Sequence, residues 1–215
     1  MASKRFQDRR AAGRELAERI GDVPDGDAVV LAIPRGGIEI GAEVASALGA
    51  SLDVAEVHEV QGHAPEIGLG VVTPQGERNV RRSTAGAVGV DQEELEGRLT
   101  DERATLREII DAVRVERPRV PVEGRTVVIV DDTLSNLSET VAVADGARRE
   151  GARQVVLAVA VAADHFGNDV QEEIDRLVYV EQGGDIVRPE DWFEHLEVPD
   201  TAAAAAIVIG HRSPR

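Results

Sequence analysis

The chain has 215 residues, of which 42% are hydrophobic and only 2% aromatic, so its core must be built from Val, Ala, Ile and Leu. It contains no cysteine, which excludes disulfides and thiolate zinc sites, and no apolar run approaches the ~20 residues of a membrane helix. Its 40 Asp and Glu outnumber 24 Lys and Arg, and the net charge of −16 argues against general DNA or RNA binding, which needs a basic face.

Apolar periodicity and turn residues predict alternating helices and strands. In chain order they are a helix at 6–20, a strand at 28–33, a helix at 38–48, strands at 52–57 and 67–72, a helix at 91–117, a strand at 125–130, a helix at 137–150, and strands at 154–161 and 177–180. Asp91 with Glu94 is a candidate capping pair for the long helix. The alternation predicts an α/β fold with a mostly parallel twisted sheet flanked by helices.

The acidic surplus also bears on where the protein works. Lys4 is the only lysine, and all other basic residues are arginine. Salt screens the self-repulsion of such a surface, so we interpret it as an adaptation to a high-salt, halophilic cytoplasm. An ordinary acidic protein is the alternative. The opening residues MASKRFQDRR lack the apolar stretch of a signal peptide, so the expected location is cytoplasmic.

Two predicted strands end in polar loops, and ligands of α/β sheets bind beyond the carboxyl ends of strands. One loop holds Arg35, Gly36 and Gly37 just before a helix, which suits an anion. The other begins with Asp131 and Asp132, which suit a diol or, through water, Mg²⁺. The alternatives are a tight turn with an exposed arginine and a solvated acidic turn. No GxxxxGK[ST] motif occurs, which argues against P-loop nucleotide hydrolysis.

Most of the chain resembles the type I phosphoribosyltransferase family. RFQDRRAAGRELAERI is similar to its opening helix, VVLAIPRGGIEIGAEVASALGASLDV to its first strand, pyrophosphate loop, helix and second strand, PEIGLGVV to the strand before its mobile loop, and GRTVVIVDD to its phosphoribosyl-diphosphate segment. The resemblance implies transfer of a phosphoribosyl group from phosphoribosyl diphosphate to a base, releasing pyrophosphate, with Mg²⁺ as cofactor. It also implies one domain over 1–215, with an N-terminal helix at about 1–25 and a small C-terminal hood at about 176–215.

The resemblance assigns roles to individual residues. Arg35, Gly36 and Gly37 would bind pyrophosphate, in a loop that often contains a non-proline cis peptide. Asp131 and Asp132 would be the catalytic pair, holding the ribose hydroxyls and, through water, Mg²⁺. The loop that would bind the 5′-phosphate comprises Thr133, Leu134, Ser135, Asn136, Leu137, Ser138, Glu139 and Thr140. The mobile loop would contribute Arg78, Arg81 and Arg82.

The phosphate loop departs from the family pattern, in which Thr-Gly-x-Thr follows three variable residues. Asn136, Leu137 and Glu139 replace Thr, Gly and the second Thr. Leucine adds bulk, and Glu139 puts a negative charge where a phosphate should approach. The same residues could instead form a capping box, with Asn136 as N-cap and Glu139 folded back on it. His58 and Glu59 replace the family's basic residues after the strand at 52–57, and we expect His58 to be exposed and incidental.

Three functions remain open. The Arg35 loop and the aspartate pair favour an active phosphoribosyltransferase acting on a purine-like or other base. The altered loop and Glu59 favour a catalytically degenerate regulator or nucleotide sensor. An unrelated α/β metal or phosphate enzyme is the third. We expect phosphoribosyl diphosphate or a nucleotide as ligand, no nucleic acid or membrane partner, and a homo-oligomer, a dimer. For Trp192 and Phe193 we favour core packing over stacking on a base.

Overall fold

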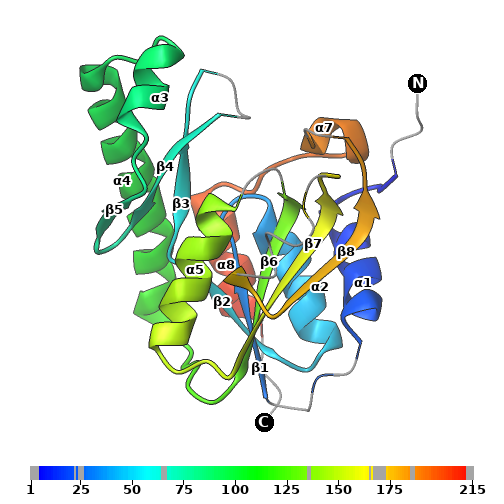
Figure 1. Ribbon diagram of the computed structural model, residues 1–215. Coiled ribbons are helices and arrows are strands. Elements are labelled where there is room, and N and C mark those ends of the chain that lie inside the picture. Colours follow the sequence, from blue (N-terminus) through cyan, green and yellow to red (C-terminus); the bar gives the residue numbers. More distant parts are fainter. Residues whose placement is uncertain are drawn as a thin grey trace.

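The computed structural model describes residues 5–21, 23, 27–63, 67–134, 137–164, 166, 173–184 and 187–211. Its main sheet has five parallel strands in the order β2-β1-β6-β7-β8 (Figure 1). They are β1 (Ala28–Ala32), β2 (Ser51–Val54), β6 (Thr126–Leu134), β7 (Gln154–Ala162) and β8 (Arg176–Gln182). The central strands are buried on both faces, which explains their continuous runs of Val, Ala, Ile and Leu. The predicted α/β class is confirmed.

Helices cover both faces of this sheet. α1 (Arg9–Ile20) and α2 (Gly37–Ala47) pack together on one face, and α5 (Ser138–Arg149) lies on the other (Figure 1). Right-handed connections require this arrangement, because β1 leads through α2 to β2 in one direction and β6 leads through α5 to β7 in the other.

A smaller lobe stands beside the main sheet (Figure 1). It contains the antiparallel strands β3 (His58–Gln61), β4 (Gly68–Thr73) and β5 (Gly76–Arg78), and the helices α3 (Arg82–Ala87) and α4 (Gln92–Glu116). We call these elements the small lobe. Val60 and Leu69 of its sheet and Leu95, Leu99 and Leu106 of α4 belong to a second apolar cluster, separate from that of the main sheet.

Two strand boundaries differ from those predicted. β2 ends at Val54, before the end predicted at Val57, and β3, which the sequence analysis did not predict, begins at His58 in the small lobe. β6 continues past the expected end at Val130 to Leu134, because its last residues still pair with β7. Neighbouring β1 has already ended at Ala32, so one side of the β6 end is open.

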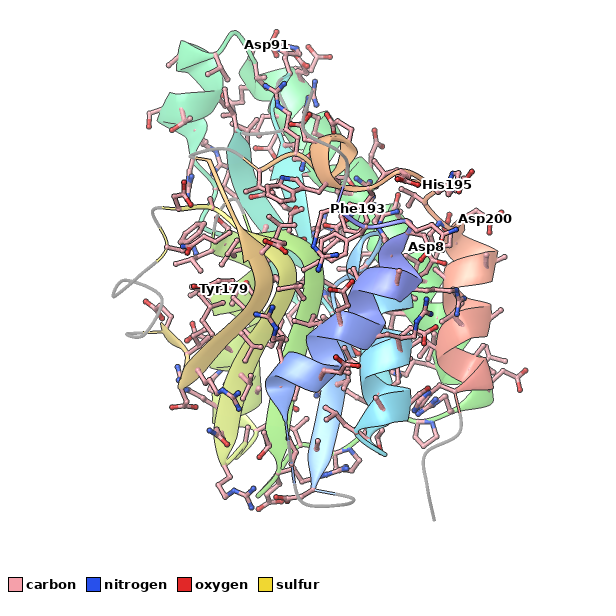
Figure 2. The ribbon with its side chains drawn as sticks, turned by 90° about the vertical axis from the view of Figure 1, so that its right-hand side faces the viewer. Asp8, Asp91, Tyr179, Phe193, His195 and Asp200 are labelled. Atoms are coloured by element: carbon pink, nitrogen blue, oxygen red, sulfur yellow. The ribbon has the colours of Figure 1, made fainter. Side chains whose placement is uncertain are left out.

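Aspartates cap three helices at the positions labelled in Figure 2. The side chain of Asp8 accepts a hydrogen bond from Ala11 N at the start of α1, and Asp200 caps α8 (Thr201–Gly210) in the same way. Asp91 caps α4 by accepting from Glu94 N at 2.9 Å, as the sequence predicted. The Glu94 carboxylate instead accepts from Arg98.

The C-terminal segment packs its aromatics against the N-terminus. α7 (Pro189–Trp192) is followed by Phe193, which is labelled in Figure 2. Its buried ring lies 5.3 Å from that of Phe6. The expected core packing is therefore confirmed for Phe193. Within the part of the chain that is described, no helix combines the length and apolar character needed to cross a membrane.

Candidate functional site

The main sheet has a topological switch point between β1 and β6, because the chain leaves these neighbouring strands in opposite directions. Such a point leaves a crevice at the carboxyl ends of the strands, where ligands bind. A cavity of about 260 Å³ lies there. Its charged lining residues are Arg9, Arg35, His58, Glu59, Asp131, Asp132, Glu139, Arg188 and Glu190. The two polar loops identified from the sequence therefore meet at one cavity.

Gly36 and Gly37 allow α2 to start directly against β6. A Cβ atom on Gly37 would overlap the carbonyl oxygen of Val130, and one on Gly36 would overlap the carboxylate of Asp132. The positive end of α2 consequently faces the cavity. The expected cis peptide is wrong, since no cis bond occurs in the described residues. The loop instead holds Arg35 at φ 72°, a conformation that non-glycine residues rarely adopt.

Asp132 is engaged by an arginine that the sequence analysis missed. Arg9 Nε and Nη2 both donate to Asp132 Oδ2, at 3.0 and 2.9 Å, and the two side chains are only 4% and 8% exposed. Arg9 Nη1 also donates to the carbonyl of Glu197, and its guanidinium lies over the ring of Phe193. Arg9 was detectable as the charged member of an otherwise apolar stripe with Ala12, Leu16 and Ile20.

Asp131 differs from Asp132 in environment. It is partly exposed and lines the cavity, and its Oδ1 accepts from the backbone N of Asp132 at 2.8 Å. Burial, followed by the negative charge of Asp132, raises the pKa of Asp131 well above its usual range. The two aspartates are therefore not equivalent, because Asp132 is tied to the Arg9 side chain while the Asp131 carboxyl accepts from the backbone of Asp132.

Glu139 does not form the expected capping box. α5 starts at Ser138 after Leu137, which makes no side-chain cap, so Glu139 is the second helical residue instead of the third. Its Oε1 accepts from the backbone N of Glu59 at 2.7 Å, which joins α5 to β3. Burial, followed by the charge of Glu59, raises the pKa of Glu139 to about 8. Ser135 and Asn136 lie outside the described residues.

The rest of the predicted phosphate loop divides between two elements. Thr133 and Leu134 belong to β6, not to a loop, and the Thr133 hydroxyl donates to Asp132 Oδ1 at 3.2 Å. Ser138 and Thr140 are buried in the first turn of α5, and Thr140 lines the cavity.

The predicted mobile arginine loop spans the end of β5 and the start of α3. Arg78 ends β5, and its side chain lies outside the described residues. Arg81 precedes α3 and donates to the Ser138 hydroxyl at 3.3 Å, next to the cavity. Arg82 pairs with Glu96 on α4. Arg81 therefore contacts the first turn of α5 beside the cavity, whereas Arg82 pairs within the small lobe.

His58 is buried, so the expectation of an exposed histidine is wrong. Its Nδ1 lies 2.8 Å from Glu102 Oε2, and Arg35 Nη2 lies 2.9 Å from the same oxygen. Burial opposes ionisation of Glu102, but His58 and Arg35 outweigh it and lower the pKa of Glu102 below its ordinary value. The expectation failed because His58 begins β3 of the small lobe, a strand that the sequence analysis did not predict.

The donor set fits a hydrated Mg²⁺. No group of three or more histidine or acidic side chains in the described residues could hold an ion directly. Asp131 nevertheless lines the cavity, and the negative charge that helps burial to raise its pKa would be relieved by a cation. Mg²⁺ keeps several waters and is commonly bound by one or two carboxylates together with substrate phosphates.

Comparisons with known proteins agree with this geometry. No protein-family model matches the chain. Proteins named "Putative phosphoribosyl transferase" in two Mycobacterium tuberculosis strains, CDC 1551 / Oshkosh and H37Rv, are 34% identical over 162 residues, which are 75% of this chain. The matched segment spans only 37% of those relatives.

Among solved structures, the protein TT1426 from Thermus thermophilus has a TM-score of 0.73 and 31% identity, covering 96% of this chain and 99% of that one. AQ2163 from Aquifex aeolicus shares the fold, with a TM-score of 0.52 and 9% identity over 93% of this chain and 82% of its own.

The sheet order and the polar site at its switch point define a doubly wound α/β protein with a ligand crevice at the carboxyl ends of its strands. With these relatives, the chain belongs to the type I phosphoribosyltransferase family. The hypothesis of an unrelated α/β enzyme is therefore wrong.

Proposed function

We propose that the protein transfers a phosphoribosyl group from phosphoribosyl diphosphate to a nitrogen of a base and releases pyrophosphate. The observation that carries this proposal is the cavity at the switch point, which both Arg35-Gly36 and Asp131-Asp132 line. In the reaction, the bond from the anomeric carbon to pyrophosphate breaks, a carbon–nitrogen bond to the base forms, and the base nitrogen loses its proton.

Each wall of the cavity has a role in this proposal. The first amides of α2 and the guanidinium of Arg35 bind the pyrophosphate and stabilise its charge as it leaves. Asp131 accepts hydrogen bonds from ribose hydroxyls, and Asp132 is held in place for the same purpose by Arg9. Bound Mg²⁺ would neutralise part of the diphosphate charge, with Asp131 and Asp132 holding it through water.

The state of Glu139 removes one objection to catalysis. A carboxylate beside a phosphate would repel it, but a pKa of about 8 leaves Glu139 mostly uncharged at neutral pH. An uncharged carboxyl group does not repel a dianion and can donate a hydrogen bond to it. Glu139 is therefore compatible with an anionic ligand below about pH 8.

The test has two stages, both in molar potassium chloride. Calorimetric titration with phosphoribosyl diphosphate and Mg²⁺ should give binding that Arg35→Gln weakens about tenfold or more, since it removes a charge-assisted contact. The exposed Arg10→Gln variant is the matched control. A panel of purine and pyrimidine bases is then assayed for pyrophosphate release.

The outcomes separate the two candidate functions. Release with at least one base supports the enzyme. Binding without release on any base favours the sensor, which the bulk of Leu137 just before α5 also favours. Absence of binding in the first stage overturns both.

A further inference from the structure

Glu102 connects the small lobe to the loop that carries Arg35. The carboxylate lies on α4, and its Oε2 contacts both Arg35 Nη2, at 2.9 Å, and His58 Nδ1, at 2.8 Å. Arg35 comes from the connection between β1 and α2, and His58 from β3. Arg35 and His58, which come from separate elements, therefore both contact the same oxygen atom of Glu102 beside the cavity.

The two partners of Glu102 differ in how far their side chains are buried. His58 is 5% exposed and Glu102 24%, whereas the Arg35 side chain is 47% exposed. His58 thus contacts Glu102 from the buried side, and Arg35 contacts it from the more exposed side. Arg35 also has the unusual backbone φ of 72°, which surrounding contacts must maintain.

An anion at the first turn of α2 requires the same guanidinium. Arg35 lines the cavity next to Gly36, while Glu102 already neutralises its charge. A carboxylate within hydrogen-bond distance of a cation competes with any other anion for that cation. Removing the carboxylate should therefore strengthen anion binding, whereas a residue that only orients Arg35 would weaken binding when removed.

We propose that Glu102 is an intramolecular competitor for Arg35, held in position by His58, and that a diphosphate entering the cavity takes Arg35 away from Glu102. The exchange breaks an ion pair between the small lobe and the main sheet, so ligand binding loosens the small lobe at this point. The inference rests on the proposed function, because that function supplies the diphosphate.

Inorganic pyrophosphate with Mg²⁺ is the probe for a double-mutant cycle by calorimetry. Glu102→Gln should bind pyrophosphate about threefold or more tightly than the parent, and Arg35→Gln should bind it more weakly. In the Arg35→Gln background, Glu102→Gln should have little further effect, because the competition is for Arg35. The matched control is Glu108→Gln, which removes an exposed carboxylate of the same helix and should bind like the parent.

The second measurement compares the variants first without ligand and then with pyrophosphate. The ¹⁵N signals of the His58 imidazole, assigned with a His58→Asn variant, should move in Glu102→Gln and in Arg35→Gln but not in Glu108→Gln. Added pyrophosphate should move the parent's His58 signals in the direction that Arg35→Gln does, because both release Arg35 from Glu102.

The failures are distinguishable. If the parent binds pyrophosphate and Glu102→Gln binds it equally or more weakly, the competition is wrong while the proposed function stands. If the ¹⁵N signals of His58 do not move in Arg35→Gln, the proposed competition between Glu102 and a diphosphate for Arg35 is also wrong. If neither the parent nor Glu102→Gln binds pyrophosphate, the proposed function and the competition both fail.

Discussion

The carboxyl group of Glu139 is buried where α5 meets β3, beside Glu59 and near Asp132 and Arg35. Its pKa rises from 4.5 to about 8, mainly through burial. Between these two pH values the folded protein holds a proton that the unfolded chain has lost. The free energy of unfolding contributed by this group therefore falls as the pH rises through that interval and is lowest above about pH 8.

Glu139→Gln should remove this dependence, since glutamine resembles the protonated acid and cannot ionise. We expect the melting temperature of the variant to exceed that of the parent by a margin that grows between about pH 5 and pH 8. Thermal melts across this range measure it, with exposed Glu108→Gln as the control for a lost charge. A margin that does not change with pH would contradict the assigned protonation of Glu139.

Arg9 and Asp132 form a buried ion pair, whose contribution to stability can be tested by substituting Arg9. Removing one partner of a buried pair leaves an uncompensated charge and typically costs about 3–5 kcal/mol. Arg9→Met should lower the free energy of unfolding by about that amount, and Arg9→Lys by less, because lysine keeps the charge but not the two-donor geometry.

Urea denaturation measures the effect of both Arg9 variants, and Arg10→Met is the control because Arg10 is the exposed neighbour in the same helical turn. If the free energies of unfolding of Arg9→Met and Arg10→Met differ by less than about 1 kcal/mol, the buried pair does not stabilise the fold as its burial indicates.

At the scale of elements, the position of α2 depends on the absence of a side chain at Gly37. A Cβ there would overlap the backbone oxygen of Val130, which cannot move without disturbing β6. Gly37→Ala should therefore destabilise the fold by about 2 kcal/mol or more, through strain at the α2–β6 contact.

The matched comparison is Gly97→Ala in α4, where a Cβ meets nothing within 4 Å. There alanine should raise the free energy of unfolding by about 0.5–1 kcal/mol, because it favours the helix over glycine. Urea denaturation of the two variants should give opposite signs. If Gly37→Ala left the free energy of unfolding unchanged or raised it, α2 would be able to shift away from β6, which would contradict the close contact inferred at the switch point.

The sequence predicted which elements exist better than where they end. Runs such as 127–130 are apolar and β-branched, so the strand was recognisable from its own residues. Its end was not, because Asp131, Asp132 and Thr133 are polar and favour a turn, whereas pairing with β7 keeps them extended. The separation of β2 from β3 likewise depends on which sheet each strand joins, and no local pattern encodes that choice.

Some residues of the candidate site could likewise be predicted from the sequence, and others could not. Arg35, Gly36 and the aspartate pair could be located because each follows a buried strand directly in sequence. Arg9 lies 123 residues before its partner Asp132, and Glu102 reaches Arg35 across 67 residues. Such contacts arise only when a helix packs against a distant strand or loop, so the pattern around Arg9 or Glu102 contains no local signal of the partner.

At the scale of the whole molecule, the charge distribution combines many ion pairs with a large surplus of carboxylates. Exposed pairs such as Arg5–Glu15 and Arg82–Glu96 contribute about 0–1 kcal/mol each, and salt weakens them. The net charge of −16 acts in the opposite sense, because its self-repulsion destabilises the compact state and salt relieves it. The balance between these two effects decides how stability responds to salt.

We expect the melting temperature to rise with potassium chloride into the molar range. The Debye length falls from about 10 Å at 0.1 M to about 3 Å at 1 M, so repulsion between unpaired carboxylates is largely removed, while each exposed pair loses little. Thermal melts at low and high potassium chloride measure the response, and an unchanged or lower midpoint in high salt would contradict it.

A variant that neutralises four exposed carboxylates of α4 tests the cause of this rise. The substitutions are Asp101→Asn, Glu108→Gln, Asp111→Asn and Glu116→Gln, which change the net charge from −16 to −12. If repulsion is the cause, the variant should melt higher than the parent at low salt and gain less from added salt. Arg9→Met serves as the contrast, since its buried defect is screened weakly and should persist at every salt concentration. A variant that gains as much from salt as the parent would show that a general salt effect, and not the acidic surplus, stabilises the protein.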